Sequence, residues 1–286
     1  AEEVKQLAEM NDASLILFDN ELSPSQMSNL EELTGRTVLD RSALILDIFA
    51  QRARTGEGKL QVELAQYQYI LPRLAGMGKA MSRLGGGIGT RGPGESKLES
   101  DRRHIRSRID KLRRDLEQVR QVRSVQRRQR KKAELPLVAI VGYTNAGKST
   151  LMNLLTQAGV LAEDKLFATL DPTARALKLP GGKTVMLIDT VGLVRRLPHH
   201  LVEAFRSTLE QAATADIILN VCDASSPEAR THLDVTNEIL QSLGCGDRPV
   251  IPVLNKWDLV GDADSALHLT GAVRISALKN EGVPAL

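Results

Sequence analysis

The stretch GYTNAGKST, residues 142–150, has the residue types and spacing of a phosphate-binding loop. Gly142, Gly147, Lys148 and Ser149 match the pattern G-x-x-x-x-G-K-[ST], in which backbone N–H groups surround a phosphate. The apolar run LVAIVG before the loop predicts a strand, and STLMNLLTQ after it has the apolar spacing of a helix. Because strand, loop and helix follow in this order, we expect the N–H groups at the helix N-terminus to bind the β-phosphate of a nucleotide.

Four residues near this loop predict the chemistry of a nucleoside triphosphate. Lys148 is expected to bridge the β- and γ-phosphates, and the Ser149 hydroxyl is expected to ligate Mg²⁺. The stretch TVMLIDTVG puts Asp189 at the end of an apolar strand, where its carboxylate can hold Mg²⁺ through a water molecule. Gly192 follows and can offer its N–H to a γ-phosphate. We therefore interpret Lys148 and Gly192 as catalytic groups for phosphate transfer.

Two later motifs predict that the base is guanine. PVIPVLNKWD ends an apolar run with Asn255, Lys256 and Asp258. A carboxylate aimed at N1–H and N2–H₂ of guanine forms a bidentate bond that adenine cannot supply, and the Lys256 stem can lie along the base. RISAL places Ser276 and Ala277 after another short run, where a backbone N–H could meet guanine O6. Asn-Lys-x-Asp alone could be only a turn at a strand end, but the four motifs in this order favour nucleotide recognition.

These motifs each follow a predicted strand, so they require a mostly parallel sheet whose carboxyl ends share one edge. We expect this α/β domain at residues 133–286, with a final helix missing, because the chain stops soon after SAL. The predicted nucleotide site comprises Gly142, Tyr143, Thr144, Asn145, Ala146, Gly147, Lys148, Ser149, Thr150, Asp189, Gly192, Asn255, Lys256, Asp258, Ser276 and Ala277.

Two segments before this domain have a narrow apolar seam. The residues of each seam recur at steps of four and three, which predicts two helices that zip together as an antiparallel hairpin over residues 57–132. The seam residues are Leu60, Leu64, Tyr67, Leu71 and Leu74 in the first helix and Ile105, Ile109, Leu112, Leu116 and Val119 in the second.

A glycine-rich loop, residues 76–94, forms the expected tip of this hairpin. It holds eight glycines, three basic side chains and no acidic one. Gly87, Gly89 and Gly92 match the G-x-G-x-x-G dinucleotide fingerprint, but that motif requires a buried strand before the glycines, and here a helix precedes them. We interpret the loop instead as a thin cationic backbone that can approach another surface closely.

Charge is concentrated in the second helix of the hairpin. Residues 95–132 carry 15 Lys or Arg against 6 Asp or Glu, a net charge of +9 in a chain whose total is +3. Mixed charge runs are usually solvated helix faces, but RSVQRRQRKK has almost one sign and favours a polyanionic partner. Aromatic content of 3% suggests that RNA would be bound through charge and backbone more than through base stacking.

The remaining features concern the cellular compartment and the fold of the amino-terminal residues. Two cysteines and no membrane-length apolar run favour a reducing, cytoplasmic compartment without a membrane partner. Residues 1–56 predict a small α/β unit, with strands at 14–18 and around Val38 and a helix from Pro24 to Gly35. We expect Ser42 to cap a further helix, and we find no catalytic arrangement in this unit.

The sequence resembles the HflX family of ribosome-associated GTPases. From about Val138 onward it looks like a translation-factor-type GTPase domain. The family resemblance is carried by VLDRSALILDIFAQRARTGEGKLQVELAQYQYILPRL, GGGIGTRGPGES and DRRHIRSRI, which precede that domain. The FATLDPTAR stretch also fits and makes Thr169 the switch threonine, a catalytic residue whose hydroxyl completes the Mg²⁺ shell when GTP is bound.

The resemblance implies a cytoplasmic partner, the large ribosomal subunit. It implies a monomeric factor, not directed to DNA, that splits stalled or idle ribosomes and puts its glycine-rich loop near the peptidyl-transferase RNA. The residues that we expect to contact RNA on this basis are Arg83, Gly85, Gly86, Gly87, Gly89, Arg91, Arg102 and Arg103.

Two features of the site modify the expected mechanism. Leu193 stands where Ras-like GTPases carry the Gln that orients the attacking water, so we expect slow intrinsic GTP hydrolysis that the ribosome stimulates. Asn145 occupies the position at which related GTPases hold K⁺, although it could also only bridge the turn. As an alternative function, the hairpin could mediate dimerisation, or serve ribosome assembly or hibernation, under the control of GTP.

Overall fold

The computed structural model describes residues 1–84, 97–132, 135–156, 167, 170, 173–195, 201, 212–261, 267 and 269–286, with the backbone alone for 75–84, 97 and 126–132. These residues divide into two compact units. The first contains residues 1–51 and 59–118, and the second contains residues 52–58 and 119–286.

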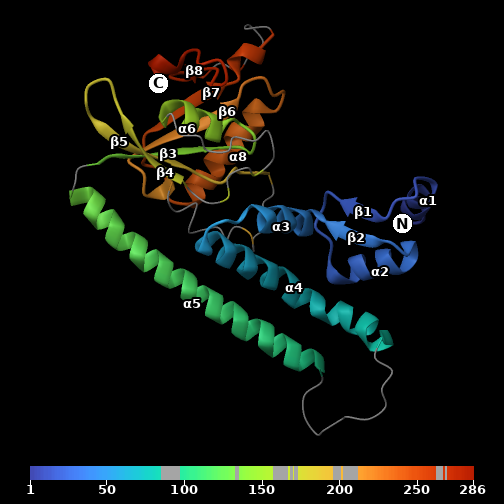
Figure 1. The fold of residues 1–286 in the computed structure, drawn as a ribbon. Coiled ribbons are helices and arrows are strands. Elements are labelled where there is room, and N and C mark those ends of the chain that lie inside the picture. Colours follow the sequence, from blue (N-terminus) through green and yellow to red (C-terminus); the bar gives the residue numbers. More distant parts are fainter. Residues whose placement is uncertain are drawn as a thin grey trace. The chain divides into compact units, whose positions relative to one another are not determined.

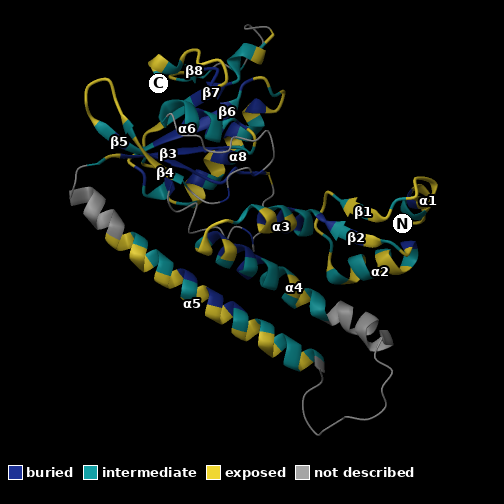
Figure 2. Ribbon diagram, in the orientation of Figure 1, coloured by how far each residue is buried: buried dark blue, intermediate teal, exposed yellow. Residues whose placement is uncertain are grey.

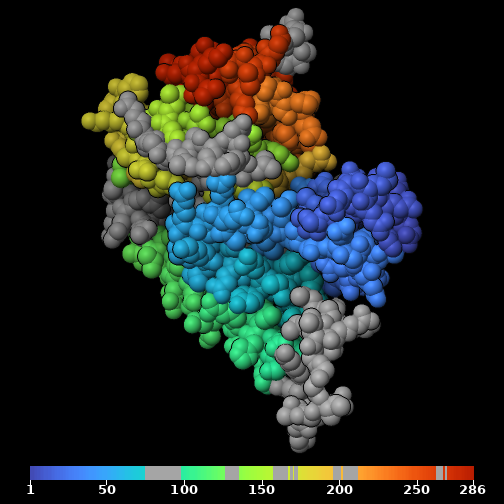
Figure 3. All heavy atoms as spheres, turned by 45° about the vertical axis from the view of Figure 1, so that its right-hand side comes forward, coloured from blue at the N-terminus to red at the C-terminus, as the bar shows by residue number. Residues whose placement is uncertain are grey.

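The first unit begins with two strands and three helices (Figure 1). They are α1 Glu2–Met10, β1 Leu15–Phe18, α2 Pro24–Thr34, β2 Thr37–Asp40 and α3 Arg41–Arg52. The strands β1 and β2 pair in parallel, and α2 supplies the crossover connection that parallel neighbours need. The amino-terminal segment lies at the surface, dark blue in Figure 3, and Leu7, Met10, Leu15 and Leu17 on it are exposed.

Local capping chemistry sets the ends of α2 and α3. Ser23 caps α2 by accepting a hydrogen bond from the Gln26 N–H, and Gly35 ends the helix in a left-handed conformation with φ of 64°. The expectation that Ser42 caps α3 is wrong, because that residue lies inside the helix. The cap is Asp40, whose carboxylate accepts a 2.8 Å hydrogen bond from the Ala43 N–H.

Two long helices follow, α4 Gly56–Leu84 and α5 Lys97–Lys132. In the first unit they pack through the seam anticipated from the sequence, with Leu64, Ile109, Leu112 and Leu116 buried at its centre. Glu63 pairs with Arg108 at 2.6 Å, and Glu57 nearer the start of α4 pairs with Arg123 further along α5. The Glu63–Arg108 pair lies within the first unit and the Glu57–Arg123 pair within the second, and the antiparallel hairpin stays a prediction. Residues 76–84, expected as the start of the glycine-rich loop, are instead helical and end α4, and residues 85–94 lie outside the described residues.

The second unit is built on a six-stranded sheet in the order β4-β5-β3-β6-β7-β8. The strands are β3 Leu137–Gly142, β4 Thr173–Lys178, β5 Thr184–Asp189, β6 Ile217–Asp223, β7 Val250–Asn255 and β8 Val273–Arg274. All neighbours pair in parallel except β4, which runs antiparallel to β5 at the sheet edge. The helices α6 Lys148–Thr156 and α8 Ala229–Ser242 and the short 3₁₀ turns η1 Trp257–Leu259 and η2 Val283–Ala285 complete the described elements.

The sheet is covered on both faces, which explains why β3 is buried at every position. Val138 and Ile140 point to the face on which Leu151 of α6 packs. The intervening Ala139 points to the opposite face, where Leu240 of α8 lies. Figure 2 shows the buried strands between these helices. Each large side chain fully buried here contributes about 1.5 to 3 kcal/mol relative to exposure.

Because the central strands are parallel, their carboxyl ends meet at one edge of the sheet. Gly142 ends β3, Asp189 ends β5, Asp223 ends β6 and Asn255 ends β7. This is the edge at which open α/β sheets bind ligands. Among the helices that the structure describes, none is long and apolar enough to cross a membrane.

Candidate functional site

The loop between β3 and α6 has the backbone of a tight phosphate cradle. Gly142 has φ of 149°, and a Cβ there would lie 2.1 Å from the Val221 carbonyl oxygen, so only glycine lets the strands approach this closely. Gly147 has φ of 88°, and Asn145 is exposed in the left-handed region with φ of 61°. The helix α6 begins at Lys148, so its first N–H groups border the loop.

Lys148 is buried under this loop, with 6% of the residue exposed. Its ammonium donates a 2.8 Å hydrogen bond to the carbonyl of Tyr143. Burial lowers the pKa of Lys148 to about 8, and the nearby Asp189 carboxylate opposes this effect. Because burial removes part of the hydration of this ammonium, a bound phosphate would stabilise its charged form.

The hydroxyl of Ser149 and the carboxylate of Asp189 meet across the site. The Ser149 hydroxyl donates a 2.7 Å hydrogen bond to Asp189 Oδ2. A hydroxyl and a carboxylate are oxygen donors of the kind that Mg²⁺ prefers, so these two side chains fit the metal that accompanies a nucleotide triphosphate. Thr150, the next residue of α6, is half-buried.

The segment after β5 lies directly on the phosphate loop. The Leu193 N–H donates to the Gly142 carbonyl at 3.1 Å, and the Thr144 N–H donates to the Leu193 carbonyl at 2.8 Å. Leu193 itself is 3% exposed. A Cβ on Gly192 would lie 2.8 Å from Thr144 Cα and 3.2 Å from the Lys148 ammonium. The backbone of Gly192 therefore sits beside the lysine that would bind the γ-phosphate.

Asn255 joins the base end of the site to the phosphate end. Its side-chain amide donates a 2.8 Å hydrogen bond to the Ala146 carbonyl, and its Oδ1 accepts a 3.0 Å hydrogen bond from the Ala277 N–H. The Ser276 N–H donates to the Glu281 carbonyl at 3.0 Å. Both N–H groups thus donate within the protein in this structure, and the contact of one of them with guanine O6 stays a prediction.

The two charged residues of the Asn-Lys-x-Asp motif are each held by a partner. Lys256 adopts a left-handed conformation, with φ of 59°, and its ammonium lies 2.7 Å from Asp223 Oδ2. The Asp258 side chain is 6% exposed and lies 3.5 Å from the Lys279 ammonium. A hydrogen bond from the Ser276 side chain lowers the pKa of Asp258, against an opposing effect of burial, and Lys279 lowers it further. Asp258 is thus a carboxylate, ready to accept from N–H groups.

Asp223 is a functional candidate that the sequence reasoning missed. Burial raises the pKa of its carboxyl, but hydrogen bonds from Lys256 and Ser225 outweigh burial and leave the pKa below its usual range. A signal was available, since Asp223 ends a buried strand at the same sheet edge as Asp189 and Asn255.

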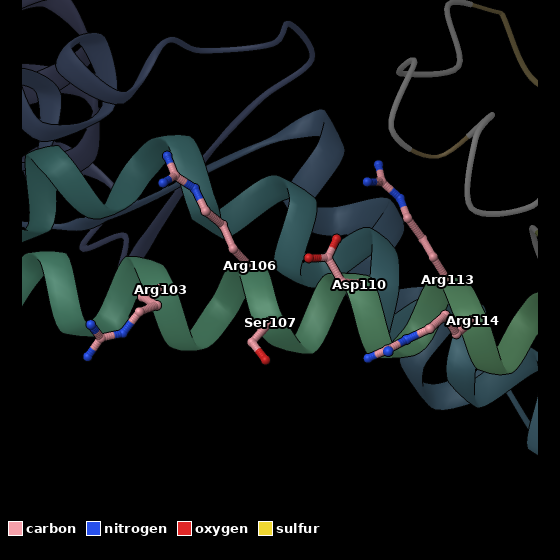
Figure 4. Close-up of a pocket in the computed structure, with 6 residues that line it drawn as sticks. All are labelled: Arg103, Arg106, Ser107, Asp110, Arg113 and Arg114. Atoms are coloured by element: carbon pink, nitrogen blue, oxygen red, sulfur yellow. The ribbon is translucent and has the colours of Figure 1, made fainter.

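A second candidate surface lies on α5. Six neighbouring residues line an open hollow of about 570 Å³, and four of them are arginines (Figure 4). Arg106, Asp110 and Arg113 project to one side of the helix, and Arg103, Ser107 and Arg114 to the other. The four arginines are exposed, so they give this surface a positive charge that attracts polyanions.

Several residues expected to function fall outside the described part of the chain. They are Thr169, Gly85, Gly86, Gly87, Gly89 and Arg91. Arg83 lies on α4 with only its backbone described, Arg102 is half-buried on α5, and Arg103 is exposed there. The structure thus brings together the phosphate loop, Asp189, Gly192 and the base motif, and leaves the RNA contacts as expectations.

Three family models match successive parts of the chain. Residues 1–50 match the GTP-binding GTPase N-terminal model, and residues 52–130 match the GTP-binding GTPase Middle Region. Residues 137–256 match the model described as 50S ribosome-binding GTPase.

Individual relatives and a solved structure agree with these matches. The chain is 57% identical over 259 residues to GTPase HflX of Caldanaerobacter subterraneus subsp. tengcongensis, which covers 91% of the chain and 60% of that protein. It is 56% identical to GTPase HflX of Lacrimispora saccharolytica and 45% identical to that of Escherichia coli, each match covering 100% of the chain and 68% of the relative. A GTP-binding protein of Sulfolobus solfataricus solved with GDP is 28% identical, with a TM-score of 0.54 and coverage of 99% and 81%. The chain therefore spans 60% to 68% of these three bacterial relatives.

Proposed function

The chain belongs to the HflX family of GTPases, and we propose that it binds and hydrolyses GTP and, in the GTP state, binds the large ribosomal subunit and splits stalled or idle ribosomes. The observation that carries the proposal is the junction made by Asn255, which connects a guanine-reading motif to a phosphate loop through buried hydrogen bonds. We propose a cytoplasmic location on the same basis, because that is where the proposed partner, the ribosome, works.

The phosphate end of the site supplies the charge for hydrolysis. Lys148 neutralises oxygens of the β- and γ-phosphates, and the Gly192 N–H binds the γ-phosphate as its charge changes. Ser149, with Asp189 through a water molecule and Thr169, would hold Mg²⁺, which supplies further charge neutralisation when bound. Water attacks the γ-phosphorus, the bond to the β-phosphate oxygen breaks, and GDP and phosphate leave.

The base end supplies specificity for guanine. The Asp258 carboxylate accepts from N1–H and N2–H₂, which adenine lacks in this arrangement. The Lys256 stem lies along the base, in a position supported by its 2.7 Å contact with Asp223. Guanine O6 meets the N–H of Ser276 or Ala277, groups that donate to the Glu281 carbonyl and to Asn255 Oδ1 in this structure.

Because Leu193 stands at the position of a water-orienting residue, we propose that the isolated protein hydrolyses GTP slowly. A leucine side chain cannot hydrogen-bond the attacking water, and this one is buried against the protein. The missing catalytic part then comes from the ribosome or from K⁺ at Asn145, which is exposed and has a left-handed backbone conformation. Equal single-turnover rates in potassium and sodium buffers would remove the role of K⁺.

The helical hairpin is the proposed ribosome-binding element, between a small α/β unit at 1–56 and the GTPase domain at 133–286. Exposed Arg103, Arg106, Arg113 and Arg114 on α5 support contact with RNA phosphates. The glycine-rich tip is proposed to enter a narrow RNA site near the peptidyl-transferase centre. Replacing Gly85–Gly87 with bulkier residues should then impair ribosome splitting without weakening GTP binding.

Phosphate release from GTP and from ATP, measured with and without purified large ribosomal subunits, tests the proposed function. We expect slow release from GTP alone, faster release from GTP with the subunits, and none above background from ATP. Lys148→Ala is the negative control for both conditions. Equal rates with GTP and ATP, or a GTP rate that the subunits do not change, would contradict the proposal.

A further inference from the structure

The second residue of the phosphate loop, Tyr143, makes contacts that a phosphate cradle does not need. Its ring stacks on the imidazole of His232 in α8, with centroids 3.8 Å apart and planes inclined by 15°. Its hydroxyl accepts a 3.1 Å hydrogen bond from the N–H of Arg195, three residues beyond Gly192. One side chain therefore joins the phosphate loop to α8 and to the segment that follows β5.

Glu228 closes these contacts into a ring of four residues. It is the N-cap residue of α8, where the helix dipole favours a negative charge. One carboxylate oxygen lies 3.4 Å from Arg195 Nη1, and the other lies 3.7 Å from His232 Nε2. Tyr143, Arg195, Glu228 and His232 thus form a closed ring, which we name the switch ring.

The switch ring holds backbone that faces the γ-phosphate position. Between its members, the Leu193 N–H and carbonyl are bonded to the phosphate loop at 3.1 and 2.8 Å. Gly192 is buried against Thr144 and lies close to the Lys148 ammonium. Among the described residues, the Gly192 N–H has no acceptor. A buried N–H beside a lysine, for which the described part of the chain offers no acceptor, is suited to receive an anion.

We propose that Tyr143, Arg195, Glu228 and His232 are positioning residues that hold residues 191–195 against the phosphate loop, so that the preference of the protein for GTP over GDP depends on them. The inference rests on the proposed function and concerns the same site. GDP makes no γ-phosphate contact, so a loosened switch ring weakens the binding of GTP selectively. The Leu193 backbone bonds this segment to the phosphate loop on one side, and the ring adds contacts through Arg195 on the other.

Exposure of the ring distinguishes positioning from simple stabilisation. The side chains of Arg195 and Glu228 are 44% and 58% exposed. An ion pair this exposed contributes little to the free energy of unfolding. Its loss should therefore change the thermal midpoint only slightly, whereas a change in the position of Gly192 alters the contact of its N–H with the γ-phosphate.

The test measures dissociation constants for GDP and for a non-hydrolysable GTP analogue in two variants, together with the thermal midpoint. Glu228→Gln keeps the size of the side chain but removes its charge, and we expect the analogue to bind about fivefold more weakly while GDP affinity changes less than twofold. Tyr143→Phe keeps the stacked ring but removes the acceptor for Arg195, and we expect it to weaken the analogue more than GDP. In the double variant the losses should not add, because both substitutions open one ring.

Asp234→Asn is the matched control. Asp234 pairs with Arg230 on the same helix at 3.6 Å, is comparably exposed, and belongs to no part of the switch ring. It should leave both dissociation constants unchanged. Equal weakening of GDP and analogue in the ring variants, or the same selective loss in Asp234→Asn, would overturn the inference. If the parent protein binds neither nucleotide, the proposed function fails instead, which keeps the two failures distinct.

Discussion

The side chain of Asn255 donates a 2.8 Å hydrogen bond to the carbonyl of Ala146, which precedes it by 109 residues. The oxygen of the same amide accepts from the Ala277 N–H. One buried side chain therefore connects the end of β7 to the phosphate loop and to the segment after β8. A Cβ on Gly147 would lie 2.2 Å from its nitrogen, which shows how closely the phosphate loop is packed against it. We therefore propose that binding of the base and binding of the phosphates are coupled through this contact.

Replacing Asn255 with Ala should destabilise both ends of the site. The substitution leaves the Ala146 carbonyl and the Ala277 N–H without their partner in a buried place, which costs about 2 to 4 kcal/mol of unfolding free energy. Urea denaturation of the nucleotide-free protein measures that loss, and titration should show weaker binding of both GDP and GTP. Asn255→Asp keeps the acceptor for Ala277 and loses the donor to Ala146, so intact nucleotide binding in that variant would argue against the coupling.

The pKa of Lys148 predicts how nucleotide affinity depends on pH. In the free protein the pKa is about 8, and bound phosphates favour the charged ammonium, so the pKa is higher in the complex. Binding above pH 8 therefore takes up a proton, and GDP affinity should fall as pH rises from 8 to 9.5. Calorimetry in buffers of different ionisation enthalpy measures this uptake. Lys148→Arg, which stays charged, should bind with little dependence on pH over that range.

A side chain at position 192 should prevent the γ-phosphate contact. In Gly192→Ala the new Cβ would lie 2.8 Å from Thr144 Cα, so the backbone must move away from Lys148. We expect at least a hundredfold loss of single-turnover GTP hydrolysis and a smaller loss of GDP affinity. Gly246→Ala is the control, because a Cβ there meets nothing within 4 Å. Hydrolysis at the parent rate in Gly192→Ala would show that this N–H has no catalytic part.

Asp258 should determine which purine is bound. In Asp258→Asn the side chain can still accept from N1–H, but its amide N–H₂ opposes the N2–H₂ group of guanine. Xanthine carries a carbonyl at that position, so the variant should lose about a hundredfold in affinity for GTP and gain affinity for xanthosine triphosphate. Competition binding with the two nucleotides measures the exchange. Unaltered preference for GTP would mean that the base is recognised elsewhere.

A separate prediction concerns stability of the first unit. Asp40 is fully buried, and Arg73 Nη2 and the Tyr69 hydroxyl lie 3.0 and 2.9 Å from its carboxylate. Asp40→Asn removes the charge and leaves the half-buried Arg73 without its anion, which should cost about 3 to 5 kcal/mol of unfolding free energy. Chemical denaturation followed by circular dichroism checks this value. Asp19→Asn is the control, since the Asp19 partner of Arg41 is 91% exposed and should contribute less than about 1 kcal/mol.

Local patterns predicted the parts of the site that depend on contiguous sequence. The strand, loop and helix around Gly142 and Lys148 follow from spacing alone, and parallel strands bring Asp189 to Ser149. The helical seam on α4 and α5 also follows from its periodicity. These features could be predicted from the sequence because each depends on a short run of residues or on the direction of a strand.

The contacts that sequence reasoning missed join residues far apart in the chain. The pairing of Asp223 with Lys256 and the stacking of Tyr143 on His232 arise only when the sheet and α8 have assembled. The capping of α3 by Asp40 was missed for a different reason, since both Asp40 and Ser42 have good capping side chains and tertiary contacts decided between them. Residue spacing alone does not show which distant side chains will pair or which of two candidate residues will cap a helix.

Sedimentation with purified large ribosomal subunits tests the central claim most directly. The protein should sediment with the subunits in the presence of a non-hydrolysable GTP analogue and stay in the supernatant with GDP, and this binding should weaken steeply as salt is raised because exposed arginines contact phosphates. Equal sedimentation with both nucleotides, or nucleotide-dependent dimers that do not bind the subunits, would contradict the account.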